Sequence, residues 1–149
     1  MPINEICNRE VIIVQPGDTV LEAAKLMRQH HVGDVVVVDD RGGVRVPVGI
    51  VTDRDIVVEV MAPELDPMAI TVGDIMVPEL ATMKENTGVF EAIRYMRAKG
   101  VRRLPVVDES GGLVGILALD DLLELLAEEL SDIAKLLKCE QKKEMMGRR

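Results

Sequence analysis

The sequence predicts an α+β protein made of two tandem β-α-β-β-α units that pack through their sheets with pseudo-two-fold symmetry. Two observations predict this fold. The 149-residue chain is an approximate tandem duplication, and within each copy the apolar pattern changes between strand and helix periods in the same order. A single unit of this size buries its sheet face poorly, so the two copies are expected to pack together.

The duplication becomes visible when Ile3 is placed on Val72, an offset of 69 residues. Further along, Gly49 matches Gly115 at an offset of 66, so the second copy has a shorter hairpin. We predict a first unit at 1–60, a linker at 61–71, a second unit at 72–127, and an extended C-terminal helix and tail at 128–149. The matched pairs include Ile6 with Ile75, Val20 with Val89, Glu22 with Glu91, Ala23 with Ala92, Met27 with Met96, and Val37-Val38-Asp39 with Val106-Val107-Asp108.

Each unit begins with a short strand and a helix. In the first unit the strand covers 11–14 and ends at Pro16-Gly17-Asp18. A helix follows from about Thr19, because Thr19 and Glu22 have the spacing of a capping box and apolar residues repeat along one face behind them. The second unit repeats that face, with Gly88 at the position of the cap.

A hairpin and a closing helix complete each unit. The continuous apolar runs at 35–38 and 104–107 predict strands buried on both faces. Pro105 cannot donate a ladder hydrogen bond, which favours an edge or strand-start position. Glycine-containing turns lead to strands at 46–51 and 113–117. We also expect a short helical turn at 72–76 and a long helix from about Asp120.

Composition excludes several classes of function. The net charge of −8 and the near absence of aromatic residues argue against nucleic-acid binding. No apolar run reaches the roughly 20 residues of a membrane helix. With Cys7 and Cys139 as the two cysteines, neither a disulfide framework nor a cysteine-rich zinc site is expected, and a cytoplasmic setting is the simplest prediction. His30 and His31 are interpreted as structural, and no metal site is expected.

Residues 49–55 carry the main candidate site. An apolar run ends there, and Thr52 and Asp55 follow at the start of a helix, where unpaired N–H groups favour an anion. The same two side chains could instead form only a capping box. Residues 115–121 repeat the pattern with Asp121 at the acidic position, but Ala118 replaces the threonine. The sequence therefore predicts one complete and one incomplete version of the same site.

In combination, these motifs resemble the tandem cystathionine-beta-synthase (CBS) domain pair, also called a Bateman module. The matching segments are Gly-Ile-Val-Thr-Asp-Arg-Asp at 49–55, Gly-Asp-Ile-Met at 73–76 and Val-Arg-Arg-Leu-Pro-Val-Val-Asp at 101–108. The resemblance extends from about Ile3 to Leu126. It implies two pseudo-symmetric clefts between the copies, which take adenosine-containing ligands such as AMP, ADP or ATP.

The resemblance also implies roles for individual residues. Asp55 would bond the ribose hydroxyls and Thr52 the phosphate of the ligand in the first cleft, while Asp121 keeps the ribose role in the second. Arg102 and Arg103 match positions that reach phosphates, Arg103 being the better candidate, although Arg102 could equally be an ordinary surface charge. Apolar positions that flank the adenine are matched by Ile12, Val32 and Ile116.

The expected function is a non-catalytic regulatory module that senses an adenine nucleotide and acts in trans on an unknown protein or on its own assembly. No cofactor is required. A competing hypothesis is a structural or interaction protein whose clefts are vestigial. The C-terminal helix favours self-association, because its leucines continue beyond the second unit and require cover. Proteins with this domain pair commonly form disc-like homodimers, and we expect a homodimer.

Overall fold

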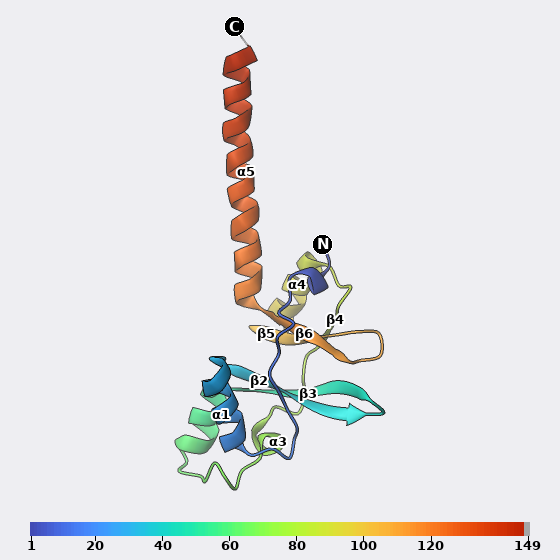
Figure 1. Ribbon diagram of the computed structural model, residues 1–149, viewed down its shortest axis with the longest axis vertical. Helices are drawn as coiled ribbons and strands as arrows, with labels where there is room; N and C mark the ends of the chain where they lie inside the picture. Colours follow the sequence, from blue (N-terminus) through green and yellow to red (C-terminus); the bar gives the residue numbers. More distant parts are fainter. Residues whose placement is uncertain (148–149) are drawn as a thin grey trace.

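The computed structural model describes residues 1–147 and contains two three-stranded sheets with helices on their outer sides (Figure 1). In the first repeat the elements are β1 (Ile13–Val14), α1 (Val20–His30), β2 (Asp34–Arg41), β3 (Val44–Thr52), α2 (Asp53–Ile56) and a π-helical turn, η2 (Val57–Met61). In the second they are β4 (Met83–Lys84), α4 (Val89–Lys99), β5 (Arg103–Val107), β6 (Leu113–Ala118) and α5 (Leu119–Gly147). Two short helices, η1 (Ile3–Glu5) and α3 (Val72–Ile75), precede the repeats. The predicted fold class is confirmed.

The two sheets have the same topology. In each, the middle strand pairs in parallel with the short first strand and antiparallel with the third, in the orders β1-β2-β3 and β4-β5-β6. The antiparallel register shifts between Val37 and Val38 in one sheet and between Val106 and Val107 in the other. These are equivalent positions, so the duplication preserves even the local irregularity of the hairpin.

The predicted edge or strand-start position of Pro105 is wrong, because β5 is the central strand of its sheet and Pro105 is its third residue. In the first repeat the equivalent residue, Val36, donates its N–H to the carbonyl of Ile12 at 2.9 Å, and the parallel pairing begins at Val36. Pro105 has no N–H to donate. The parallel pairing with β4 begins one residue later, at Val106, so the sheet accommodates the proline by shortening one ladder.

The middle strands are buried on both faces, as predicted. Val35 and Val37 belong to a core cluster beneath α1, whereas Val36 and Val38 pack with Ile116 of the opposite sheet. The second repeat has its own cluster beneath α4 and α5, which includes Leu104 and Val106. The molecule therefore has two helix-covered cores and a third apolar layer between the sheets.

The segment that precedes each repeat packs into the core of the other repeat. Ile3 is fully buried in the cluster of the second repeat, and Val72 is fully buried in that of the first. Matching backbone bridges hold these segments, Thr19 with Thr71 and Pro2 with Gly88. The exchange makes each repeat dependent on its partner for a complete core.

Candidate functional site

Thr52 and Asp55 form a capping box at the start of α2. The N–H of Asp55 donates to Thr52 Oγ1 at 3.1 Å, and the N–H of Thr52 donates to Asp55 Oδ2 at 2.8 Å. Thr52 is the last residue of β3 and has an extended backbone, so the helix begins directly after it. The structural explanation of this motif is therefore present, and any role toward a ligand is additional to it.

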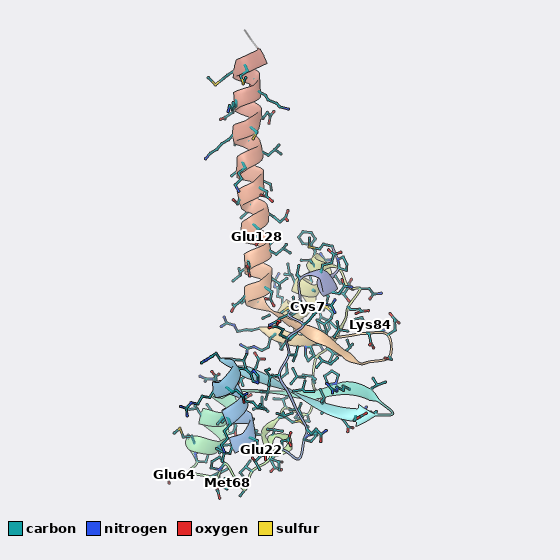
Figure 2. All side chains as sticks on the ribbon, in the orientation of Figure 1. Cys7, Glu22, Glu64, Met68, Lys84 and Glu128 are labelled. Carbon is teal, nitrogen blue, oxygen red and sulfur yellow. The ribbon has the colours of Figure 1, made fainter. Side chains whose placement is uncertain are left out.

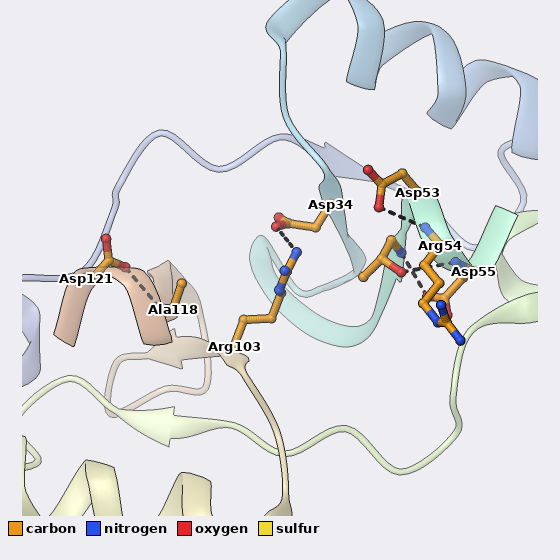
Figure 3. Close-up of polar contacts among 8 residues, drawn as sticks. Asp34, Asp53, Arg54, Asp55, Arg103, Ala118 and Asp121 are labelled. Carbon is orange, nitrogen blue, oxygen red and sulfur yellow. Dashed lines mark hydrogen bonds and ion pairs between the residues drawn. The ribbon is translucent and has the colours of Figure 1, made fainter. Parts of the chain in front are cut away.

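The equivalent junction in the second repeat is only half formed. The N–H of Ala118 donates to Asp121 Oδ2 at 2.9 Å, the counterpart of the bond between Thr52 and Asp55 (Figure 3). Alanine has no hydroxyl to accept the reciprocal N–H bond. One junction therefore presents a hydroxyl beside its carboxylate, and the other presents the carboxylate alone.

Arg103 forms an ion pair with Asp34 between the repeats. Arg103 Nη1 donates to Asp34 Oδ2 at 2.6 Å, and the exposed fractions of the two side chains are 34% and 26% (Figure 3). The two residues are separated by 69 positions, the offset of the duplication. The same position of the repeat thus carries opposite charges in the two copies and pairs across the pseudo-two-fold axis.

A cleft of about 710 Å³ lies beside Thr52 and Arg103, and we call it cleft one. Segments from both repeats form its walls: the end of β3 and start of α2, the chain before β4, and the end of α4 with the start of β5. The lining residues are Ile50, Thr52, Asp53, Arg54, Val77, Glu79, Leu80, Ala81, Tyr95, Lys99, Val101, Arg102 and Arg103.

A smaller cleft of about 220 Å³, cleft two, lies beside Ala118 and Asp34. Nearly every residue of its wall is the duplicate of a residue in cleft one; Ile116 corresponds to Ile50, for example, and Val32 to Val101. The lining residues are Asn8, Glu10, Val11, Ile12, Val32, Gly33, Asp34, Ile116, Ala118, Asp120 and Asp121. The clefts are therefore two copies of one site on opposite sides of the pseudo-axis.

The two clefts have opposite electrostatic character. The wall of cleft one contains four basic side chains, Arg54, Lys99, Arg102 and Arg103, and two acidic ones, Asp53 and Glu79. In cleft two the ionisable groups that the structure describes are all acidic: Glu10, Asp34, Asp120 and Asp121. Cleft one therefore attracts an anionic group such as phosphate, whereas cleft two repels one.

The predicted ligand residues divide between the clefts. Thr52, Arg102 and Arg103 line cleft one. Ile12, Val32, Ile116 and Asp121 line cleft two. Asp55 does not itself line cleft one, but it is hydrogen-bonded to Thr52, which does. Sequence reasoning missed Lys99, Arg54 and the apolar wall of cleft one, formed by Ile50, Ala81 and Val101. Applying the repeat offset to Ile116, Ile12 and Val32 would have identified these three apolar residues.

Burial against the core of the second repeat raises the pKa of the Cys7 thiol. The N–H and hydroxyl of Thr71 lower the pKa of Asp74 in a further capping box that begins α3. Within residues 1–147 no group of three or more metal-ligating side chains is brought together. Over the same residues, no helix has the length and apolar character needed to cross a membrane.

Comparison with known proteins identifies the repeated unit. A family model described as the CBS domain matches twice, at residues 3–62 and 72–128. The chain is also 38% identical over 123 residues to an uncharacterized protein of Methanopyrus kandleri, MK0525. That match covers 83% of this chain but 61% of the relative, so the chain spans less than two thirds of that protein's length.

Solved structures show the same arrangement. The CBS domain pair of protein MJ0100, in complex with 5′-methylthioadenosine and S-adenosyl-L-methionine, is 26% identical, covers 87% of this chain and 98% of its own, and has a TM-score of 0.74. The hexameric CBS-CP12 protein from bloom-forming cyanobacteria is 29% identical, covers 83% of this chain and 69% of its own, and has a TM-score of 0.72.

Proposed function

The chain belongs to the CBS-domain family and contains a tandem pair of these domains, and from this premise we propose that it is a non-catalytic regulatory module that binds an adenine nucleotide in cleft one. The observation that carries the proposal is the charge difference between two otherwise duplicated clefts. Four basic side chains gather at the cleft that also has the threonine hydroxyl. Phosphate favours such a combination of cations, hydroxyl and helix N-terminus.

The remaining groups of cleft one suit the other parts of a nucleotide. Ile50, Ala81 and Val101 provide an apolar wall for the adenine, and the Asp55 carboxylate beside Thr52 suits the vicinal hydroxyls of the ribose. Arg102 is available to the phosphate at the same cleft. The ligand thus meets residues from both repeats, so its binding would change how the repeats contact each other and a partner.

One N–H group of Arg103, on Nη1, donates to Asp34 and so competes with or is shared by any phosphate in cleft one. The ion pair is partly exposed, and such pairs contribute about 0–1 kcal/mol. A nucleotide phosphate in cleft one would compete with Asp34 for the guanidinium. Binding would then couple cleft one to cleft two, whose wall includes Asp34.

For cleft two we propose an adenosyl ligand without phosphate, either uncharged or cationic. The acidic wall and the missing hydroxyl at Ala118 disfavour a nucleotide there. The two ligands of the MJ0100 structure, 5′-methylthioadenosine and S-adenosyl-L-methionine, have these properties. The cleft's apolar residues Ile12, Val32 and Ile116 would flank the adenine, with Asp121 toward the ribose.

Calorimetric titration with AMP, ADP and ATP tests the proposal for cleft one. We expect saturable binding by the wild type and about tenfold weaker binding by Arg102→Ala and by Asp55→Ala, since a hydrogen bond to a charged group contributes about 1.5–3 kcal/mol. Asp121→Ala in cleft two is the matched control and should retain the wild-type affinity. Absence of saturable binding, or unchanged affinity in both cleft-one variants, would overturn the proposal.

The competing function is a structural or interaction protein with vestigial clefts. The observation that favours it is that Arg103 already forms an ion pair with Asp34 without any ligand. Thermal melting separates the two functions, because a ligand that binds only the folded state raises the melting midpoint by an amount that grows with its concentration relative to its Kd. A midpoint that stays constant with every adenosyl compound tested would favour the interaction protein.

In either case we propose a homodimer that acts in the cytoplasm and in trans, on its own assembly or on a partner protein. Support comes from apolar side chains left exposed at equivalent places in the two repeats, Val57 on η2 and Leu123 on α5, which are 52% and 56% exposed. Sedimentation with and without AMP tests whether the ligand changes this assembly.

A further inference from the structure

Helix α5 extends well beyond the body of the molecule and carries an uncovered apolar face (Figure 1). Among its described residues only Leu122 is buried, and Leu125 packs against the core of the second repeat. Figure 2 shows the side chains beyond Glu128 directed away from the helix with the rest of the chain far from them. The exposed leucine and isoleucine residues are Leu123, Leu126, Leu130, Ile133, Leu136 and Leu137, at 38–67% exposure.

Five of these residues form a regular seam. Leu123, Leu126, Leu130, Ile133 and Leu137 follow one another at alternating intervals of three and four residues. This spacing keeps side chains on one side of a helix facing a partner helix, as in a coiled coil. The seam covers about 22 Å along the axis, from the helical rise of about 1.5 Å per residue.

The charges along α5 are divided between its two halves. Residues 119–133 contain six acidic side chains and no basic one, whereas residues 134–147 contain four lysines and two glutamates. A parallel pair of such helices would place the acidic halves side by side. An antiparallel pair places the acidic half of one copy beside the lysine-rich half of the other.

We propose that α5 pairs in antiparallel orientation with α5 of a second copy of this chain. The seam is centred on Leu130, and a two-fold axis there brings Lys138 and Lys142 of one copy within about one helical turn of Asp120 and Asp121 of the other. The helix is thus complementary to itself under that symmetry, in both its apolar seam and its charges. The proposal requires no ligand in either cleft.

Sedimentation of the full chain tests whether the seam mediates association. Leu130→Lys with Ile133→Lys should lower the oligomer mass, because both side chains lie at the centre of the seam and are 67% and 62% exposed in the single chain. Met145→Lys, at 75% exposure but outside the seam, is the matched control and should leave the mass unchanged. A monomeric wild type, or an unchanged mass for the double variant, would overturn the proposal.

Dipolar EPR distances then test the orientation. One spin label is placed on the native Cys139 in a Cys7→Ala background, and another on Ser131→Cys with both native cysteines replaced by alanine. In an antiparallel pair the two Cys139 positions are about 27 Å apart along the axis, whereas the two Ser131 positions are nearly level. We expect the Cys139 distance to exceed the Ser131 distance by more than about 10 Å. Equal distances at the two positions would indicate a parallel pair and overturn the proposal.

Discussion

Gly49 and Gly115 hold equivalent positions in the two repeats, and each leaves space for the segment exchanged with the other repeat. A Cβ at Gly49 would lie 2.6 Å from the Met76 sulfur, and one at Gly115 would lie 2.7 Å from the carbonyl oxygen of Asn8. The physical role of the glycine is to let a strand approach the segment that completes its core.

The two contacts differ in what must move, and this gives a prediction for matched variants. Gly115→Ala should lower the free energy of unfolding by about 1–3 kcal/mol, because the added methyl meets backbone. Gly49→Ala should cost less, because its closest contact is the Met76 sulfur, which can move, and the Met76 Cβ lies at 3.0 Å rather than in direct overlap with backbone. Urea denaturation of both variants measures the difference. A larger loss in Gly49→Ala would contradict this account of the exchanged segments.

Asp34 and Arg103 illustrate divergence at a single duplicated position. Had both copies kept the same charge, two like charges would face each other near the pseudo-axis, at a cost in stability. The observed pair at 2.6 Å removes that repulsion and makes the two clefts electrically unequal. One position of the repeat therefore contributes to both the packing and the proposed ligand preference.

At the scale of elements, the strand-to-helix junctions before α2 and α5 differ by one hydroxyl. Thr52 completes a capping box, whereas Ala118 makes only one of the two bonds. We predict that Thr52→Ala lowers the free energy of unfolding, and that Ala118→Thr raises it, each by about 0.5–2 kcal/mol. Circular dichroism during urea denaturation provides the measurement.

Comparing the stability changes of these two variants distinguishes the effect of the helix cap from the effect of local packing. If Ala118→Thr left the stability unchanged while Thr52→Ala reduced it, the junction before α5 would have to satisfy its N–H groups in another way. The same Ala118→Thr variant also makes cleft two more like cleft one at this position, although its acidic wall would remain.

At the scale of the whole molecule, the exchanged segments make the two repeats one cooperative unit. Val72 completes the core of the first repeat, and Ile3 completes that of the second. Both side chains are fully buried. Neither repeat can lose its partner and keep an intact core, so we expect the chain to unfold in a single transition.

Tyr95 makes this expectation testable, because it is the one tyrosine in a chain without tryptophan and lies in the second repeat. Ile3→Ala should lower the free energy of unfolding by about 2–5 kcal/mol, and Val72→Ala should also lower it. In each variant Tyr95 fluorescence and circular dichroism should report the same transition. Val58→Ala, at a 45% exposed position, is the control and should change little.

Independent unfolding of the repeats would give a different result. Val72→Ala would then weaken the first repeat alone, and the fluorescence of Tyr95 would keep its original midpoint while the dichroism shifted. That outcome would mean that the exchanged segments do not couple the two cores.

The sequence alone determined the duplicated fold, because the patterns that specify it are local. The capping box predicted at Thr19 is present, the one considered as an alternative at Thr52 is present too, and the apolar runs of the two middle strands are buried on both faces. The difference between Thr52 and Ala118 was also evident from the sequence, because aligning the two repeats places these residues at the same position. The prediction for Pro105 was wrong because the missing N–H of the proline shortens the parallel pairing with β4 but does not move β5 to the edge of the sheet.

Only the tertiary structure decided which residues share a cleft, which segment completes which core, and which partner Arg103 has. Each of these depends on contacts between residues of different repeats, tens of positions apart in the sequence. The helix and strand periodicity of a short segment contains no information about such contacts. Periodicity reports which face of an element is apolar, but the ion pair of Asp34 with Arg103 and the acidic wall of cleft two arise from how the two copies are placed against each other.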